Sequence, residues 1–263
     1  MNRRDFITCL GGAAAWPLTA HAQQADRVWR IGALMGYAES DPEAQTNVAA
    51  FREGLQKLGW TEGHKIRMDT RWVPPENAGP REQFAKELIA LQPGLILSHT
   101  TPTTAALLRE TRTIPIIFAS VSDPIGSGFV ATLSRPGGNV TGFTTIEASL
   151  GGKWLELLKE IAPHVNRVAF LFNPETATYA EYYLKLFKAA AATFAVQATT
   201  APVRDRSEVE SVIATLAGEP NGGLIVMPDS FSIAHRAGSS LGPPFRRRYT
   251  APAGRTGRRR NRY

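Results

Sequence analysis

Short buried-strand patterns alternate with helical patterns along most of this chain, and this alternation restricts the fold more than any other feature. Residues 30–36 form a compact apolar run that ends at glycine. Asp41 and Pro42 come next, and they suit the N-cap and the first position of a helix. Apolar residues then recur at helical spacing, at Val48, Phe51, Leu55 and Leu58.

The same succession is repeated through the chain. Further strands are expected at residues 66–73, 95–97, 115–119, 167–172, 196–203 and 223–229, and further helices at 84–91, 101–108, 150–161, 179–194 and 207–216. One apolar helical face comprises Leu150, Trp154, Leu157 and Ile161. Strands that alternate with helices favour right-handed crossovers and parallel sheets. The sequence therefore predicts an α/β fold of two Rossmann-like lobes with parallel sheets.

Four regions are expected from these patterns. Residues 1–22 are an export signal, residues 23–140 the N-terminal lobe, residues 141–236 the second lobe, and residues 237–263 an Arg-rich tail. Residues 140–143 are interpreted as the segment that crosses between the lobes. The tail has no apolar period, so it could not bury enough surface to offset its ordering entropy, and we expect it to be disordered.

The first residues are typical of a cleaved export signal of the twin-arginine type. Arg3 and Arg4 precede a short, weakly apolar core and an Ala-x-Ala box at residues 20–22. This pattern predicts a periplasmic protein. Cleavage there would also remove Cys9, the only cysteine, which leaves no thiol for catalysis or a disulfide.

The net charge of +7 does not indicate a nucleic-acid-binding surface. Residues 236–263 hold nine arginines and no Lys, Asp or Glu, whereas the rest of the chain carries 21 Lys and Arg against 23 Asp and Glu. The body is therefore slightly acidic, and no nucleic-acid partner is expected.

Polar residues follow the ends of the predicted strands in both halves of the chain. Ligands of open parallel sheets lie beyond these carboxyl ends. The predicted ligand-binding residues are Gly36, Tyr37, Ser98, Thr100, Thr101, Ser122, Asp123, Asn173, Thr176 and Asp229. Each polar one could instead be a helix cap, Tyr37 and Tyr179 could be packed aromatics, and His99 could bind a ligand or a neighbour.

Enzymatic readings find little support in the sequence. Residues 126–131 fit a G-x-G-x-x-A pattern with Glu147 downstream, but they lie several residues beyond the preceding strand, so a nucleotide-binding α/β enzyme remains only an alternative. The one G-x-S-x-G match, at residues 238–242, lies in the Arg-rich tail and not between a predicted strand and a predicted helix, so it does not form a nucleophile elbow, and the five histidines lack metal-ligand spacing. We expect no catalytic activity, no cofactor and no metal.

Several motifs carry a resemblance to a known family. They are RRDFI at residues 3–7, WRIG at 29–32, FREGL at 51–55, LGW at 58–60, TPTTAA at 101–106, VSDPIGSG at 121–128, RPGGNVTG at 135–142, KWLELLK at 153–159 and FNP at 172–174. With these motifs the chain resembles the ABC transporter substrate-binding family, whose relatives include aromatic-amino-acid-binding proteins of the type I periplasmic-binding fold.

The resemblance implies a function and a set of partners. Two lobes would close on a small molecule such as an amino acid, and the monomeric protein would deliver it to an ABC permease in the inner membrane. The family's ligand contacts fall in the loops that hold the ten residues named above.

The resemblance ends near residue 236, where the family continues with further strands, and it therefore implies that the second lobe of this chain is incomplete. A reading-frame change in a GC-rich gene would explain the Arg/Gly/Pro-rich sequence that follows. Two alternatives stay open: a truncated remnant without function, and a basic tail that binds nucleic acid or anionic lipid.

Overall fold

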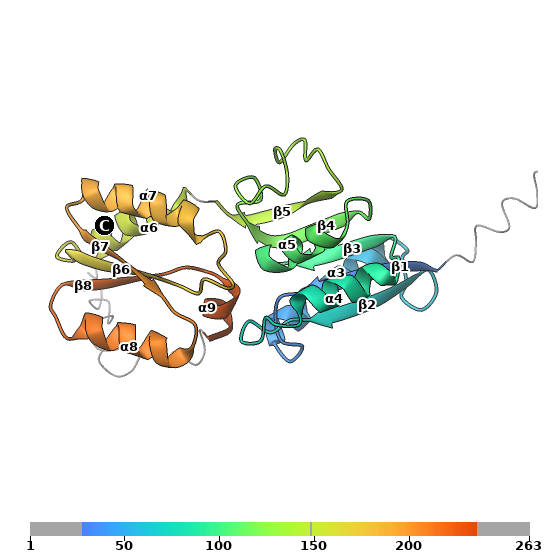
Figure 1. Cartoon of the computed structure of the whole chain (residues 1–263), viewed down its shortest axis with the longest axis horizontal. Helices are drawn as coiled ribbons and strands as arrows, with labels where there is room; N and C mark the ends of the chain where they lie inside the picture. Colours follow the sequence, from blue (N-terminus) through green and yellow to red (C-terminus); the bar gives the residue numbers. More distant parts are fainter. Residues whose placement is uncertain (1–27, 148, 236–263) are drawn as a thin grey trace, which may run out of the picture.

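The first lobe is built on a five-stranded parallel sheet. The computed structural model describes residues 28–147 and 149–235 (Figure 1). The strands of this sheet are β1 (Trp29–Met35), β2 (Ile66–Trp72), β3 (Leu95–His99), β4 (Ile116–Ser122) and β5 (Val140–Ile146), in the spatial order β2-β1-β3-β4-β5. All four pairings are parallel.

Helices cover both faces of this sheet. They are α3 (Pro42–Lys57), α4 (Arg81–Ala90) and α5 (Thr101–Glu110). Successive side chains of a strand point to opposite faces, and β1 follows this rule. Leu34 packs in the cluster that holds residues of α4 and α5, while Ala33 and Met35 pack with Val48 of α3. The lobe therefore has three layers.

The second lobe repeats the design on a smaller sheet. Its strands are β6 (Arg167–Phe172), β7 (Gln197–Pro202) and β8 (Gly222–Val226), all parallel, in the order β7-β6-β8. Its helices are α6 (Leu150–Ile161), α7 (Ala180–Thr193), α8 (Arg206–Ala217) and α9 (Ser230–His235). Helices α6 and α7 lie on one side of the sheet and α8 on the other (Figure 1).

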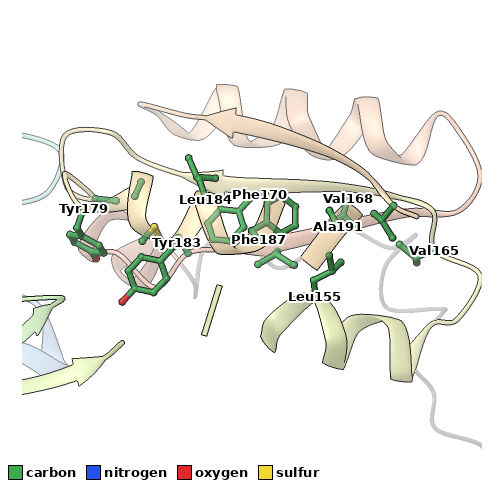
Figure 2. Packing of buried hydrophobic residues seen from close by; sticks show 14 residues of the cluster. Leu155, Val165, Val168, Phe170, Tyr179, Tyr183, Leu184, Phe187 and Ala191 are labelled. Carbon is green, nitrogen blue, oxygen red and sulfur yellow. The ribbon is translucent and has the colours of Figure 1, made fainter. Parts of the chain in front are cut away.

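An aromatic cluster fills the core of the second lobe between β6 and the helix pair α6 and α7 (Figure 2). The rings of Phe170 and Phe187 lie 5.0 Å apart, and Trp154 stacks on Tyr183 at 5.7 Å. Aromatic pairs at such spacings add to the stabilisation from buried area. The cluster holds α7 against the sheet, and with it the tyrosines at the start of that helix.

The predicted α/β fold with two parallel-sheet lobes is confirmed. The helix start predicted at Asp41 forms as expected, and Asp205 caps a second helix in the same way. The Asp41 carboxylate accepts a hydrogen bond from the Ala44 backbone at 2.8 Å, and the Asp205 carboxylate accepts one from the Glu208 backbone at 2.9 Å. Such caps satisfy helix N–H groups that have no partner within the helix.

Two details differ from expectation. Residues 140–143 were expected to cross between the lobes, but they belong to β5, which pairs with β4 in the first sheet. The chain changes lobes later, between Ile146 and Leu150. In α6, Leu157 and Ile161 are exposed, and the buried positions are Gly151 and Leu155.

The predicted export signal and the basic tail lie outside the described residues. Within residues 28–147 and 149–235, none of the helices is both long and apolar enough to cross a membrane.

Candidate functional site

A cavity of about 180 Å³ lies between the two lobes at the carboxyl ends of their strands. In each sheet the direction of chain winding reverses beside the first strand, between β1 and β3 in one lobe and between β6 and β8 in the other. Ligands of open α/β sheets bind at such switch points. Here the two switch points face the same cavity. Its lining comprises Tyr37, Glu43, Asn47, His99, Thr100, Thr101, Ser120, Ser122, Thr145, Ile146, Thr176, Tyr179, Pro228, Ser230 and Ile233.

The backbone around the first-lobe side of the cavity is strained. Thr100 has φ 90° and Ser120 has φ 55°, values that residues with a Cβ rarely adopt. The Thr100 backbone is held by a hydrogen bond from its N–H to the Ala119 carbonyl at 3.1 Å. Strain of this kind gathers at functional sites, where the surrounding structure enforces it.

Gly36 allows β1 to approach this strained segment. A Cβ at this position would lie 2.7 Å from Cγ2 of Thr100 and 2.9 Å from the His99 carbonyl oxygen, closer than ordinary contacts permit. Glycine at residue 36 therefore sets the position of Thr100, although Gly36 itself is not part of the lining.

Hydroxyl groups tie the start of α5 to its neighbours. The buried Ser98 hydroxyl bonds those of Thr103 and Thr104, at 3.1 and 2.8 Å. The Thr101 hydroxyl accepts from the Ser122 backbone at 3.1 Å, which links α5 to the end of β4. The N-cap Thr100 makes no side-chain capping bond, so the first N–H groups of α5 are not capped as those of α3 and α8 are.

His99 is the buried titratable group of the first-lobe side. It is only 5% exposed, and its ring lies 5.1 Å from that of Tyr37. Burial lowers the pKa of His99 to about 4, although the carboxylates of Glu43 and Asp41 act in the opposite direction. The imidazole is therefore neutral at ordinary pH. Its Nδ1 is buried without a hydrogen-bond partner among the described residues.

On the second-lobe side, Asp229 organises the ends of β6 and β8. Its carboxylate accepts hydrogen bonds from the Asn173 backbone at 3.2 Å, the Thr176 hydroxyl at 2.9 Å and the Ser232 backbone at 2.9 Å. Asp229 is fully buried, and this burial raises its pKa, while the hydrogen bonds lower it. The Asp229 carboxylate is thus occupied within the protein, and it holds Thr176 at the edge of the cavity.

Three tyrosines from the start of α7 reach the first lobe. The Tyr182 hydroxyl donates to the Gly126 carbonyl at 2.6 Å, and the Tyr183 hydroxyl donates to the Ile146 carbonyl at 3.1 Å. Burial raises the pKa of Tyr183 to about 12, and it also raises the pKa of Tyr179. In both tyrosines a hydrogen bond with the Ser122 side chain lowers the pKa and so offsets part of this rise. The phenols of Tyr179 and Tyr183 are therefore neutral hydrogen-bonding groups.

The structure brings half of the predicted ligand-binding residues to the cavity. Tyr37, Thr100, Thr101, Ser122 and Thr176 are in its lining. The others serve the protein itself: Gly36 allows the close approach described above, Ser98 and Asp229 hydrogen-bond their own lobes, Asn173 caps the turn through Glu175 and Thr176, and Asp123 accepts from the Gly126 backbone.

Several lining residues are not among the ten ligand-binding residues predicted from the sequence. They are Glu43, Asn47, Ser120, Thr145, Ile146, Pro228, Ser230 and Ile233. Glu43 and Asn47 lie one turn apart at the start of α3. The helix start predicted at Asp41 was therefore the signal that could have placed both residues close to the end of the first strand. Glu43 is the one charged side chain among the described lining residues, since His99 is neutral. The described lining residues include no Lys or Arg.

Two other site types find no support in the described residues. Among them, no group of three or more His, Cys, Asp and Glu side chains could hold a metal ion. Gly126 and Gly128 lie in the irregular loop between β4 and β5, which contains no helix, whereas a dinucleotide-binding glycine motif opens a helix directly after a strand.

Comparisons with known proteins agree with this geometry. Residues 39–236 match the family described as ABC transporter substrate binding protein. A curated relative, the tyrosine-binding protein of Clostridioides difficile, is 33% identical over 124 residues; the match covers 47% of this chain and 35% of the relative. The chain thus matches about a third of the length of that protein.

Solved structures share the fold. A conserved domain protein from Vibrio cholerae is 27% identical with a TM-score of 0.62, and the match covers 73% of this chain and 62% of that one. An ABC domain from Streptococcus pneumonia in complex with L-Trp is 22% identical with a TM-score of 0.68, covering 80% and 69%. A ligand-free, open substrate-binding protein from Clostridium difficile is 25% identical with a TM-score of 0.53, covering 79% and 68%.

The family match extends over most of the chain and includes both lobes and the residues on either side of the cavity. This chain belongs to the ABC transporter substrate-binding protein family.

Proposed function

We propose that this chain is the extracytoplasmic solute-binding component of an ABC importer and that it holds a small organic molecule between its lobes. The observation that carries the proposal is the cavity at which the switch points of both sheets meet, lined by residues of both lobes. A solute bound there would contact both halves at once and stabilise their closed arrangement.

The lining supports a small solute without a strong negative charge. The cavity volume of about 180 Å³ is below the roughly 300–1,000 Å³ of pockets for drug-sized ligands. The lining includes the hydroxyl-bearing residues Thr100, Thr101 and Ser122 and the tyrosines Tyr37 and Tyr179, and it contains no Lys or Arg among its described residues. An amino acid with an aromatic side chain fits this composition, and the tyrosine-binding relative supports the same class.

The proposal also covers export and location: the twin-arginine-type signal at residues 1–22 would be cleaved, and the protein would be periplasmic. We further propose that the protein is a monomer, delivers its solute to an inner-membrane permease, and binds the solute without catalysis. The chain expressed in hosts with and without a twin-arginine translocase tests the first part. Processed protein should be recovered from the periplasm only where the translocase is present, and processing in both hosts would contradict this route.

A thermal-shift screen of the full chain tests the binding function. The proteinogenic amino acids and simple aromatic carboxylic acids form the library, and the melting temperature is followed against ligand concentration. A binding solute should raise the melting temperature in proportion to RT ln(1 + [L]/Kd). A library in which no compound produces a concentration-dependent rise would overturn the proposal.

A further inference from the structure

The side chain of His99 has a buried hydrogen-bonding atom without a partner among residues 28–147 and 149–235. His99 ends β3, is 5% exposed and belongs to the cavity lining. Its Nδ1 is buried and has no partner in the part of the chain that the structure describes. Buried polar atoms are nearly always hydrogen-bonded, because an unsatisfied one keeps its full desolvation cost. His99 as a residue belongs to the cavity lining, so a group of a bound solute is a candidate partner for this atom.

The ring is held in a fixed orientation. Tyr37, which directly follows β1, packs against it with a ring separation of 5.1 Å and a tilt of 46°. The His99 carbonyl accepts a hydrogen bond from the Thr103 hydroxyl at 2.6 Å, which fixes the adjacent backbone. These two contacts restrain the ring and the backbone beside it.

The charge state of His99 limits the chemistry of that match. The charged groups that act on it are Asp41 and Glu43 at the start of α3, and burial outweighs their attraction, so the ring is neutral. A neutral imidazole carries a proton on one nitrogen and a lone pair on the other, so Nδ1 either donates or accepts. A hydroxyl group can do either, whereas an amine cation or a carboxylate suits only one of the two forms.

We propose that His99 is a specificity-determining residue whose Nδ1 hydrogen-bonds a hydroxyl group of the bound solute. The inference rests on the proposed binding function and adds to it the residue and the atom that select the ligand. Sites built to hydrogen-bond a substrate hydroxyl discriminate strongly against the analogue that lacks it, because the polar atom of the site is then left unpaired.

Two pairs of probes that differ by one hydroxyl test this role: L-tyrosine against L-phenylalanine, and 4-hydroxybenzoate against benzoate. Titration calorimetry on the full chain should give an affinity at least about tenfold higher for the hydroxyl-bearing member of a pair, as expected when a buried polar atom loses its partner. In His99→Leu the ratio should fall to near one. The exposed His164 provides the matched control, and His164→Leu should keep the wild-type ratio.

A spectroscopic measurement keeps the test independent of how well the variant folds. In the wild-type chain with ¹⁵N-labelled histidine, L-tyrosine should shift the Nδ1 resonance of His99, and L-phenylalanine should leave it nearly unchanged. Equal affinities within both pairs, or a ratio unchanged in His99→Leu, would overturn the role of His99 while the binding function stands. Failure of every compound in the wider screen would overturn both proposals.

Discussion

The hydroxyl of Tyr182, on helix α7 of the second lobe, donates a hydrogen bond to the carbonyl of Gly126 in the first lobe at 2.6 Å. The contact lies outside the lining of the cavity, since neither residue belongs to it, and the Tyr182 side chain is partly exposed. It therefore connects the lobes without touching the space between them. The phenol of Tyr182 is suited to stabilise the arrangement in which the cavity is enclosed.

Removal of this hydroxyl should weaken solute binding without changing its selectivity. Tyr182→Phe keeps the ring and loses one partly exposed hydrogen bond, worth about 0.5–1.5 kcal/mol. If that energy favours the enclosed arrangement, the affinity for the best solute of the screen should fall about two- to tenfold. Calorimetry measures the affinity, and small-angle X-ray scattering should show a larger radius of gyration. Leu186→Ala, one turn further along α7 and also exposed, is the control and should leave both values unchanged.

The stability of the protein should depend on pH through His99. Its folded-state pKa of about 4 lies below the ordinary value of 6.5, so the unfolded chain binds a proton that the folded chain excludes. The resulting contribution, on the order of 3 kcal/mol, is fully present above pH 6.5 and is lost as the pH falls toward 4. Urea unfolding at pH 7.5 and 4.5 measures the difference in unfolding free energy between His99→Asn and wild type. This difference should shift by about 2–3 kcal/mol in favour of His99→Asn at the lower pH.

The exposed His64 gives the matched control for this experiment. The difference in unfolding free energy between His64→Asn and wild type should be the same at both pH values. A constant difference for His99→Asn as well would contradict the assignment of a buried, neutral imidazole.

A side chain at residue 36 should displace the strained segment at the start of α5. The added methyl group of Gly36→Ala would lie 2.7 Å from Thr100 Cγ2 and 2.9 Å from the His99 carbonyl oxygen. Such overpacking typically costs about 1–3 kcal/mol of stability. Because Thr100 and His99 line the cavity, solute affinity should fall too. Gly54→Ala, on α3 with nothing within 4 Å of the new methyl group, should be neutral or slightly stabilising. Unchanged affinity in Gly36→Ala would show that the segment adapts.

The hydroxyl of Thr176 should matter for stability through Asp229. Thr176→Val removes one of the donors to the buried carboxylate and should cost about 1–3 kcal/mol at pH 7. Loss of the donor raises the pKa of Asp229 beyond the rise that burial already causes, so the cost should shrink as the pH falls and the carboxyl is protonated. Thr176→Ser keeps the hydroxyl and should retain most of the stability. Equal losses in both variants, measured by urea unfolding, would assign the effect to the methyl group.

The elements of the fold were predictable because their signals are local. Asp41 before Pro42, and Asp205 three residues before Glu208, identify helix starts in a few residues of sequence. The buried face of α6 was not predictable in the same way, because apolar residues occur on several sides of that helix. Its orientation depends on Gly151, where a Cβ would lie 2.5 Å from the Tyr183 carbonyl oxygen, so α7 approaches closely at that point. That contact joins residues distant in the sequence.

The candidate site was predictable in its location and only partly in its residues. The predicted strand ends identified the correct edge of each sheet, the one formed by the carboxyl ends of its strands, and Tyr37, Thr101 and Thr176 line one cavity there. Ser98 and Asp229 are also polar residues at strand ends, yet their polar atoms form hydrogen bonds within their own lobes. Sequence position does not say which way a hydroxyl or carboxylate points, since that depends on partners brought together by the fold.

The absence of Lys and Arg among the described residues that line the cavity has a consequence for the surroundings in which the protein works. Dissolved ions weaken attraction between separated charges, whereas short hydrogen bonds and aromatic contacts inside an enclosed space are little affected. A solute held by hydroxyl groups, tyrosine rings and a neutral imidazole would therefore be retained almost equally in dilute and in saline water. In the extracytoplasmic location that we propose, where the ionic strength follows the environment rather than the cell, such a site would keep its affinity steady.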